Sequence, residues 1–139
     1  MKYIKNTLNS CKNYFKKGQL HILESTTYPG TTEEYFLPIF FKRKLKVGKD
    51  IFLGYSPERE DPGNSKYSIG QISKIVSGYS LKCKNLVFLL YRQLVLKCIK
   101  VSSIKTAEMT KLLENIYRCI NIGLVNELKL VCEKMSMDI

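Results

Sequence analysis

The sequence predicts an α/β fold with a parallel sheet, because short apolar segments alternate with longer segments of helical periodicity. The four apolar segments are short enough to be buried strands and cover residues 20–23, 51–55, 74–77 and 98–101. The helical segments cover residues 3–17, a stretch that begins at Thr31 or Thr32, residues 82–96 and residues 104–135. Parallel sheets covered by helices are typical of this alternation.

Capping and breaking residues set the expected ends of the first helices. Gly18 is expected to end the helix over residues 3–17. Thr31 or Thr32 can cap the second helix, because a hydroxyl there accepts a hydrogen bond from the first turn. Pro38 lies inside this second helix and is expected to shorten or kink it.

The last helix is longer than a small sheet can cover. Apolar residues recur at helical spacing over residues 104–135, and a helix of ~30 residues spans ~45 Å. We therefore expect part of it to pack on something else, either a second domain or a second copy of the chain.

Polar loops follow three of the predicted strands, over residues 24–30, 56–64 and 102–106. In an all-parallel sheet with right-handed crossovers, these loops would meet at the carboxyl edge of the strands. Ligands bind at that edge in open α/β sheets. The loops therefore indicate a binding site.

Composition argues against several classes of protein. The net charge is +11, but only four of the 23 basic residues are arginine and the lysines are scattered, which argues against a nucleic-acid-binding module. No apolar run suits a membrane span or a signal peptide, and we expect a cytoplasmic protein that makes no membrane contact. Five cysteines without a C-x-x-C pair, and a single histidine, predict no metal site.

Four polar positions could support chemistry. Thr26 follows a strand end and could donate its hydroxyl to a ligand or a water. Lys111 and Asn115 are four residues apart, so they share one helix face and could donate to developing negative charge. Glu58 follows a strand and could orient or deprotonate a water. Taken alone, Lys111 is more often a surface lysine whose stem lies along the apolar stripe, and Glu58 a solvated turn glutamate. Thr26 alone would be an ordinary turn or cap residue.

Two motifs are missing from the sequence. It contains no Gly-x-Gly, and therefore neither the dinucleotide-binding fingerprint nor a phosphate-binding Walker loop. A single histidine also makes a Ser/His/Asp triad implausible.

Several stretches together resemble the UDP-glucose/GDP-mannose dehydrogenase family. They are residues 24–34 (ESTTYPGTTEE), 55–64 (YSPEREDPGN), 107–115 (AEMTKLLEN) and 121–128 (NIGLVNEL). The branch that they resemble most is the bacterial UDP-N-acetyl-hexosamine 6-dehydrogenases. The resemblance implies a fold consisting of the second half of a Rossmann-like parallel-sheet domain, residues 1–103, followed by the start of a helical dimerisation domain, residues 104–139.

The resemblance also implies an activity and a cofactor. The family oxidises the C6 alcohol of a UDP-sugar to a uronate, in two hydride transfers to NAD. Thr26 would lie by the nicotinamide and help to hold a water, while Ser25 and Glu60 would lie near the cofactor.

The same resemblance implies roles for the residues that meet the substrate. Glu58 would assist the water, and Glu58 and Arg59 would contact the sugar. Lys111 and Asn115 would stabilise the alkoxide and the oxyanion.

Two departures from the family pattern limit these expectations. The Gly-x-Gly-x-x-Gly loop is absent, and none of the five cysteines sits in the glycine-rich setting of the family's nucleophilic cysteine. We expect no turnover from this chain alone, because catalysis needs all its groups in one geometry.

The sequence leaves open a truncated gene product, one part of a split enzyme with complementary fragments as partners, and an excerpt of a longer one. It also leaves open an inactive remnant that only folds or forms a homodimer through the 104–135 helix. The oligomeric state and the particular sugar nucleotide are not readable from the sequence.

Overall fold

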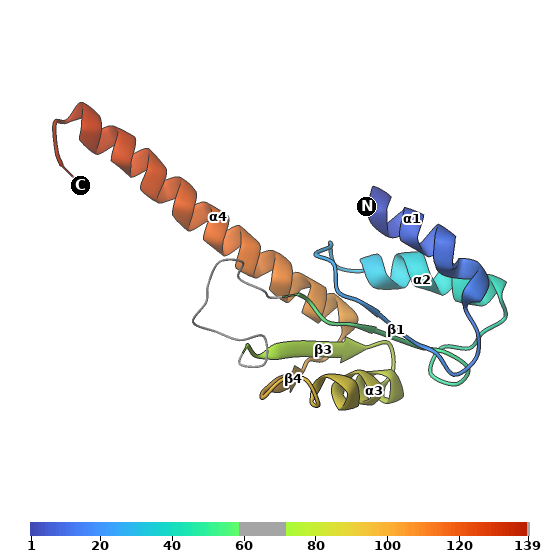
Figure 1. Cartoon of the computed structure of the whole chain (residues 1–139). Coiled ribbons are helices and arrows are strands. Elements are labelled where there is room, and N and C mark those ends of the chain that lie inside the picture. Colours follow the sequence, from blue (N-terminus) through green and yellow to red (C-terminus); the bar gives the residue numbers. More distant parts are fainter. Residues whose placement is uncertain (59–71, 139) are drawn as a thin grey trace.

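The computed structural model describes residues 1–58 and 72–138 (Figure 1). Its elements in chain order are α1 (Lys2–Cys11), a short 3₁₀ helix (Lys12–Tyr14), β1 (Leu20–Leu23), α2 (Thr31–Lys42), β2 (Phe52–Tyr55), β3 (Lys74–Gly78), α3 (Leu81–Tyr91), β4 (Cys98–Lys100) and α4 (Ile104–Lys134). The predicted α/β class is confirmed, and each predicted strand and helix has a counterpart.

The four strands form one mixed sheet in the order β1-β2-β3-β4. β1 pairs with β2 in parallel, and so does β3 with β4. The prediction of an all-parallel sheet is wrong at the centre, where β2 and β3 pair antiparallel. A parallel pair requires a crossover connection, usually a helix, and the sequence predicted no helix between these two strands. The predicted elements therefore already departed here from the strand–helix alternation of a parallel sheet.

The antiparallel pair changes where the loops lie. The loops after β1 and β2 meet at one edge of the sheet, as predicted. β4 runs the opposite way, so residues 101–103, which link it to α4, lie at the opposite edge, and the prediction that all three loops share one edge is wrong. α4 then crosses the sheet towards the first edge.

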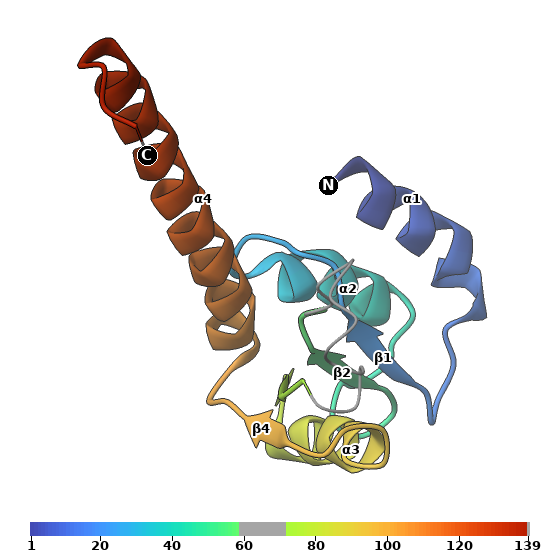
Figure 2. The ribbon, with the colours of Figure 1, turned by 60° about the vertical axis from the view of Figure 1, so that its left-hand side comes forward.

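Helices cover both faces of the sheet (Figure 2). α1, α2 and the start of α4 enclose the larger core with one face. This core is built from buried apolar side chains that include Phe36, Phe40, Leu53, Tyr55 and Ile104. α3 covers the other face, where Val76, Val87 and Tyr91 form a smaller core.

Two glycines let α3 lie directly on the sheet. A Cβ atom on Gly78 would stand 2.2 Å from the backbone nitrogen of Lys84, and one on Gly54 would stand 2.3 Å from Cγ2 of Val87. Both distances are far below van der Waals contact, so the strand and the helix can approach this closely only without a side chain between them.

Three helices differ from the sequence prediction at an end. α1 ends at Cys11 and a short 3₁₀ helix follows to Tyr14, so the prediction that this helix runs to residue 17 and is ended by Gly18 is wrong. The chain becomes extended at Phe15, whose side chain is buried in the larger core.

The other two differences concern α2 and α3. α2 continues through Pro38 to Lys42, because Phe36 and Phe40 on either side are buried in the same core and hold the helix across the missing hydrogen bond. α3 ends at Tyr91, five residues before the predicted end at residue 96. Tyr91 is the last buried residue of α3, and the residues that follow it pack on little.

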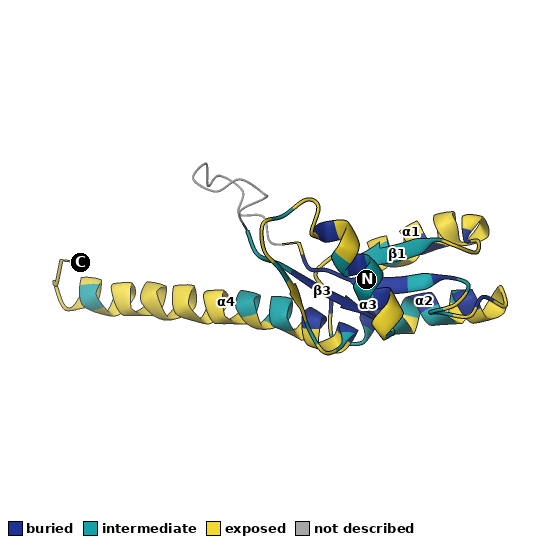
Figure 3. Cartoon of the chain, turned by 90° about the horizontal axis from the view of Figure 1, so that it is seen from below, coloured by how far each residue is buried: buried dark blue, intermediate teal, exposed yellow. Residues whose placement is uncertain are grey.

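α4 has 31 residues and is buried only at its start (Figure 3). Its buried residues are Ile104, Ala107 and Glu108, and residues 116–131 are all exposed. This agrees with the expectation that much of the helix finds no cover within the small sheet. No helix in the described part of the chain is long and apolar enough to cross a membrane.

Candidate functional site

The carboxyl ends of β1 and β2 bring two predicted site segments together. Beyond the strands, the N–H of Ser56 donates to the carbonyl oxygen of Leu23 at 3.1 Å, and the N–H of Glu58 donates to that of Glu24 at 3.2 Å. These two bonds carry the parallel pairing past the ends of the strands. Glu58 is therefore held beside the loop that contains Ser25 and Thr26, as the sequence predicted.

A lysine from the neighbouring strand joins the two carboxylates at this edge. Lys74 Nζ lies 3.0 Å from Glu24 Oε1 and 3.0 Å from Glu58 Oε2. The lysine side chain is 12% exposed, whereas those of Glu24 and Glu58 are 46% and 51% exposed. One largely buried cation therefore bridges two half-exposed anions, each at the end of a different strand.

Tyr91 supports this bridge from α3. Its hydroxyl donates to Glu24 Oε1 at 2.6 Å, and Lys74 Nζ lies 5.0 Å from the centre of its ring. Burial, followed by the hydrogen bond to Glu24, raises the pKa of Tyr91 far above its ordinary value. The phenol therefore stays protonated and remains a donor.

The sequence reasoning did not assign a role to Lys74 or Tyr91. Lys74 begins β3, and only the antiparallel pairing of β2 with β3 brings the start of that strand to the edge where β1 and β2 end. The lack of a predicted helix between the two strands argues against a parallel pair, but it does not show which residues the pairing brings together. A lysine at the start of an otherwise apolar strand was the only signal available.

A tyrosine of β2 holds the loop after β1 against the sheet. The hydroxyl of Tyr55 donates to the carbonyl oxygen of Ser25 at 3.2 Å. Burial raises the pKa of Tyr55 to about 12, so this donor also stays protonated. Ser25 and Thr26 themselves are exposed, with their hydroxyls available to a ligand at the edge.

Glu108 of α4 caps the first turn of α2. Its Oε2 accepts a hydrogen bond from the N–H of Gly30 at 2.5 Å, and its Oε1 accepts from the N–H of Thr32 at 2.8 Å and from Thr32 Oγ1 at 2.7 Å. The residue is 0% exposed. A carboxylate is favoured at this place, since a helix N-terminus has unpaired N–H groups and partial positive charge. Figure 2 shows the start of α4 beside the loop that leads into α2.

Lys111 and Asn115 continue the helix face that Glu108 begins. They lie three and seven residues beyond it, close to whole turns of a helix. Both are partly buried, whereas every residue from 116 to 131 is exposed. With Glu114, they are thus the last partly buried polar side chains before the exposed part of α4. Arg59 and Glu60 lie outside the described residues.

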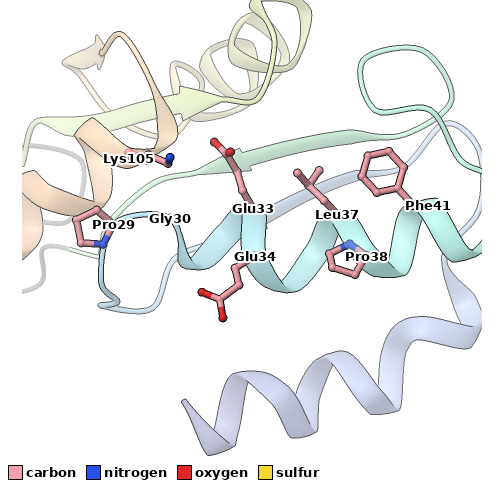
Figure 4. A pocket seen from close by; sticks show the side chains of 8 residues that line it. All are labelled: Pro29, Gly30, Glu33, Glu34, Leu37, Pro38, Phe41 and Lys105. Atoms are coloured by element: carbon pink, nitrogen blue, oxygen red, sulfur yellow. The ribbon is translucent and has the colours of Figure 1, made fainter.

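A shallow groove lies beside the site, along the outer side of α2 (Figure 4). Its lining residues are Pro29, Gly30, Glu33, Glu34, Leu37, Pro38, Phe41 and Lys105. None of these is a predicted site residue, so the groove is not the pocket in which the predicted chemistry would occur. The residues that the structure describes contain no cluster of histidine, cysteine or acidic side chains that could hold a metal ion.

Comparison with known proteins accounts for nearly the whole chain. Residues 1–95 match the NAD-binding domain of the UDP-glucose/GDP-mannose dehydrogenase family, and residues 105–139 match the central domain of that family. The chain belongs to the UDP-glucose/GDP-mannose dehydrogenase family.

Individual family members share substantial identity with the chain. The chain is 43% identical over 125 residues to the UDP-N-acetyl-D-glucosamine 6-dehydrogenase of Pseudomonas aeruginosa. The aligned residues make up 88% of this chain and 30% of that protein. The chain is 33% identical over 137 residues to the UDP-N-acetyl-D-mannosamine dehydrogenase of Methanocaldococcus jannaschii. Here the aligned residues make up 99% of this chain and 31% of that protein. The chain therefore spans about a third of the length of these relatives.

Solved structures of family members share the fold. The UDP-D-ManNAc dehydrogenase of Pyrococcus horikoshii superposes with a TM-score of 0.87 at 35% identity, over 96% of this chain and 32% of that one. The GDP-mannose dehydrogenase of Pseudomonas aeruginosa gives a TM-score of 0.80 at 20% identity over 98% of this chain and 32% of that one, which supports the fold alone. The two relatives compared by sequence above are dehydrogenases, and hence oxidoreductases.

Proposed function

We propose that this chain supplies part of the active site of an NAD-dependent dehydrogenase, which oxidises the C6 alcohol of a UDP-sugar to a uronate in two hydride transfers. The observation that carries the proposal is the meeting of Ser25, Thr26 and Glu58 at the carboxyl ends of two parallel strands. This is the edge at which α/β sheets bind cofactor and substrate. The family match and the dehydrogenase relatives support the same reaction class.

The loop after β1 and the residues after β2 would face the cofactor and the water. When bound, NAD accepts the hydride that leaves C6. The exposed hydroxyls of Ser25 and Thr26 fit a position beside the nicotinamide, with Thr26 also holding the water. Glu58 would orient that water and accept its proton, since a half-exposed carboxylate fixed at the strand end can do both. Glu60 would lie near the cofactor and Arg59 near the sugar.

The fit to NAD is partial in this chain. The edge residues suit the nicotinamide end of the cofactor, because they offer hydroxyl and carboxylate groups at a strand terminus. Nothing in the sequence offers the glycine-rich turn on which a pyrophosphate rests. The chain would therefore contact only one end of the cofactor.

Lys111 and Asn115 would act on the substrate oxygen. When the hydroxyl of C6 loses its proton and when water adds to the carbonyl carbon, negative charge develops on oxygen. An ammonium and an amide N–H on one helix face, four residues apart, can both donate to that oxygen. Their partial burial would strengthen these interactions relative to bulk water.

We further propose that residues 1–103 and 104–139 are parts of two domains, and that the helix over residues 104–135 forms a homodimer. The family models divide the chain close to this boundary, at residues 95 and 105. Apolar side chains stay exposed along α4, among them Ile120 at 64%, Leu124 at 56% and Leu128 at 51%. A row of this kind is typical of a helix that packs against another one.

The dimer proposal is tested by mass. We expect size-exclusion chromatography with light scattering to give twice the chain mass, and L124E/L128E to give the single mass. If the parent chain has the mass of a monomer, as the L124E/L128E variant should, the dimer proposal is contradicted. A K129M variant, which removes an exposed charge from the same helix, serves as the control.

The enzymatic proposal is tested by NAD⁺ reduction at 340 nm with a panel of UDP-sugars. The chain is assayed alone and mixed with the products of neighbouring genes, which would supply complementary fragments. We expect activity in at least one preparation, and its loss in K111M and N115A. K129M and N121A, at exposed positions on the same helix, should keep it.

Absence of NAD⁺ reduction in every preparation, with folded protein present, would contradict the enzymatic proposal and favour an inactive remnant. Equal loss in K111M and K129M would contradict the role given to Lys111. Binding to duplex DNA with a steep salt dependence would instead support a nucleic-acid-binding module.

A further inference from the structure

Glu108 is a buried carboxylate that the proposed chemistry does not use. It lies within α4, is 0% exposed, and all of its described partners lie in another part of the chain. Those partners, Gly30 and Thr32, stand 78 and 76 residues earlier, where the loop after β1 turns into α2. The contact therefore connects the loop that holds Thr26 to the helix that holds Lys111 and Asn115.

The geometry of this contact fixes position as well as proximity. Apolar surfaces can slide over each other at little cost, whereas hydrogen bonds weaken steeply with distance and angle. The carboxylate of Glu108 accepts three of them, from two backbone N–H groups and one hydroxyl. A shift of α4 by one residue along its axis is ~1.5 Å and would break all three.

α2 depends on this carboxylate for its cap. Its N-cap residue is Gly30, which has no side chain to satisfy the first N–H groups. Gly30 adopts φ +100°, a left-handed conformation that suits glycine, and its own N–H points to Glu108. The sequence prediction that Thr31 or Thr32 caps the helix is wrong: the hydroxyl of Thr31 donates to the carbonyl oxygen of Tyr28, and that of Thr32 donates to Glu108.

Few residues of α4 are fully buried along its described length. Only Ile104 and Ala107 are buried with Glu108 along the described helix, and Glu108 is the last of the three. Lys111 and Asn115 follow within two turns on the same side. Glu108 is thus the fully buried residue of α4 nearest to Lys111 and Asn115, and it is the one that hydrogen bonds hold to the loop after β1 and to α2.

We propose that Glu108 is a positioning residue, which fixes α4 against the loop after β1 and so sets the place of Lys111 and Asn115 relative to Thr26. Its importance for catalysis rests on the proposed function. The positioning itself is a property of the folded chain and is measured without cofactor or sugar. Failure of the dehydrogenase proposal would therefore leave this test intact.

The test uses the complete 139-residue chain and a nitroxide on Cys119, which is exposed on α4 four residues beyond Asn115. Cys11, Cys98 and Cys132 are replaced by serine, and buried Cys83 is kept. Paramagnetic broadening of the amide signals of Ser25, Thr26 and Thr27 then reports how α4 lies relative to the loop. Hydrogen exchange of the core amides of β2 and β3 reports whether the fold is intact.

Two variants separate positioning from folding. E108A removes all three acceptor contacts. E108Q keeps the shape and one carbonyl oxygen, which can still accept from Thr32, but its NH₂ group would meet the N–H of Gly30, donor against donor. We expect E108Q to speed amide exchange at Gly30 at least tenfold and at Thr32 much less, with core exchange unchanged.

The decisive readout is the broadening pattern. We expect E108A and E108Q to change the paramagnetic rates at the loop amides at least twofold, while E127Q, the same substitution at an exposed position on α4, changes none. Loop rates that stay within error of the parent in E108Q, in a chain with intact core exchange, would overturn the proposal.

Discussion

The cation bridge at the strand ends makes a quantitative prediction for K74M. The substitution keeps the length and most of the apolar stem of Lys74 but removes its charge. It breaks both 3.0 Å contacts, to Glu24 and to Glu58, and the contact of the ammonium with the Tyr91 ring. Two carboxylates at neighbouring strand ends then face each other without a cation between them.

The magnitude follows from exposure. Ion pairs between exposed side chains contribute about 0.2–1 kcal/mol each, and half-exposed carboxylates are screened by water, so neither pair should exceed that range by much. Lys74 is only 12% exposed, which places both pairs near the upper end. A cation over an aromatic ring adds about 0.5–1 kcal/mol. We therefore expect K74M to lower the free energy of unfolding by about 2–3 kcal/mol.

The assay is urea unfolding followed by circular dichroism, at low salt and at about 1 M salt, where the Debye length is ~3 Å. The difference between K74M and the parent should shrink at high salt, because both contacts are ionic. K129M is the matched control: its pair with Glu133 spans 3.8 Å between side chains that are 64% and 57% exposed, and its loss should cost less than ~0.5 kcal/mol. If K74M costs no more than K129M, the bridge does not hold the strand ends and the reasoning fails.

Three further predictions concern backbone fit and pH. G78A should lower the free energy of unfolding by about 3 kcal/mol in urea titration, since its Cβ would lie 2.2 Å from the α3 backbone. G123A, whose Cβ would have nothing within 4 Å, should raise the free energy of unfolding by ~0.5–1 kcal/mol. A G78A variant as stable as the parent would contradict the close packing of α3 on β3. G30A should cost about 1–2 kcal/mol, because alanine is strained at φ +100°, and an unchanged urea midpoint would show that α2 starts differently. Burial lowers the pKa of His21 below its usual 6.5, so the unfolded chain takes up the proton first as the pH falls. Stability should therefore fall as the pH drops below about 6.5, and His21 should contribute no pH dependence above that value. H21F should lack this part of the pH dependence, measured as urea midpoints above and below pH ~6.5.

The sequence predicted the elements well and their arrangement less well. Local signals place the strands and helices, because apolar spacing and caps act within a few residues. The antiparallel pairing of β2 with β3 depends on contacts between distant segments, and the sequence signals it only by the lack of a predicted helix between the two strands. Lys74 was missed for this reason: its role exists only once the strand start reaches the opposite strand ends.

Glu108 was missed for a related reason. In the sequence it looks like a helical glutamate among exposed neighbours, and its spacing alone suggests a solvated face. It is buried because α4 crosses the sheet and meets the N-terminus of α2. This places Glu108 against Thr32, which lies 76 residues earlier in the chain. The roles expected for Ser25, Thr26, Glu58, Lys111 and Asn115 stay predictions. The structure does put the first three at one edge and the last two on one face of α4.

The length of α4 makes it behave as a lever that pivots near Glu108. Lys134 lies 26 residues beyond this pivot, or ~39 Å along the axis, whereas Asn115 lies seven residues beyond it, or ~10 Å. A tilt of ~10° would therefore move the far end by ~7 Å and Asn115 by ~2 Å. Displacements of about 1 Å already cost catalysis heavily. Any partner that binds the exposed end of α4 would thus also steady the end that carries Lys111 and Asn115, and loss of that partner would change their position although it contacts neither residue.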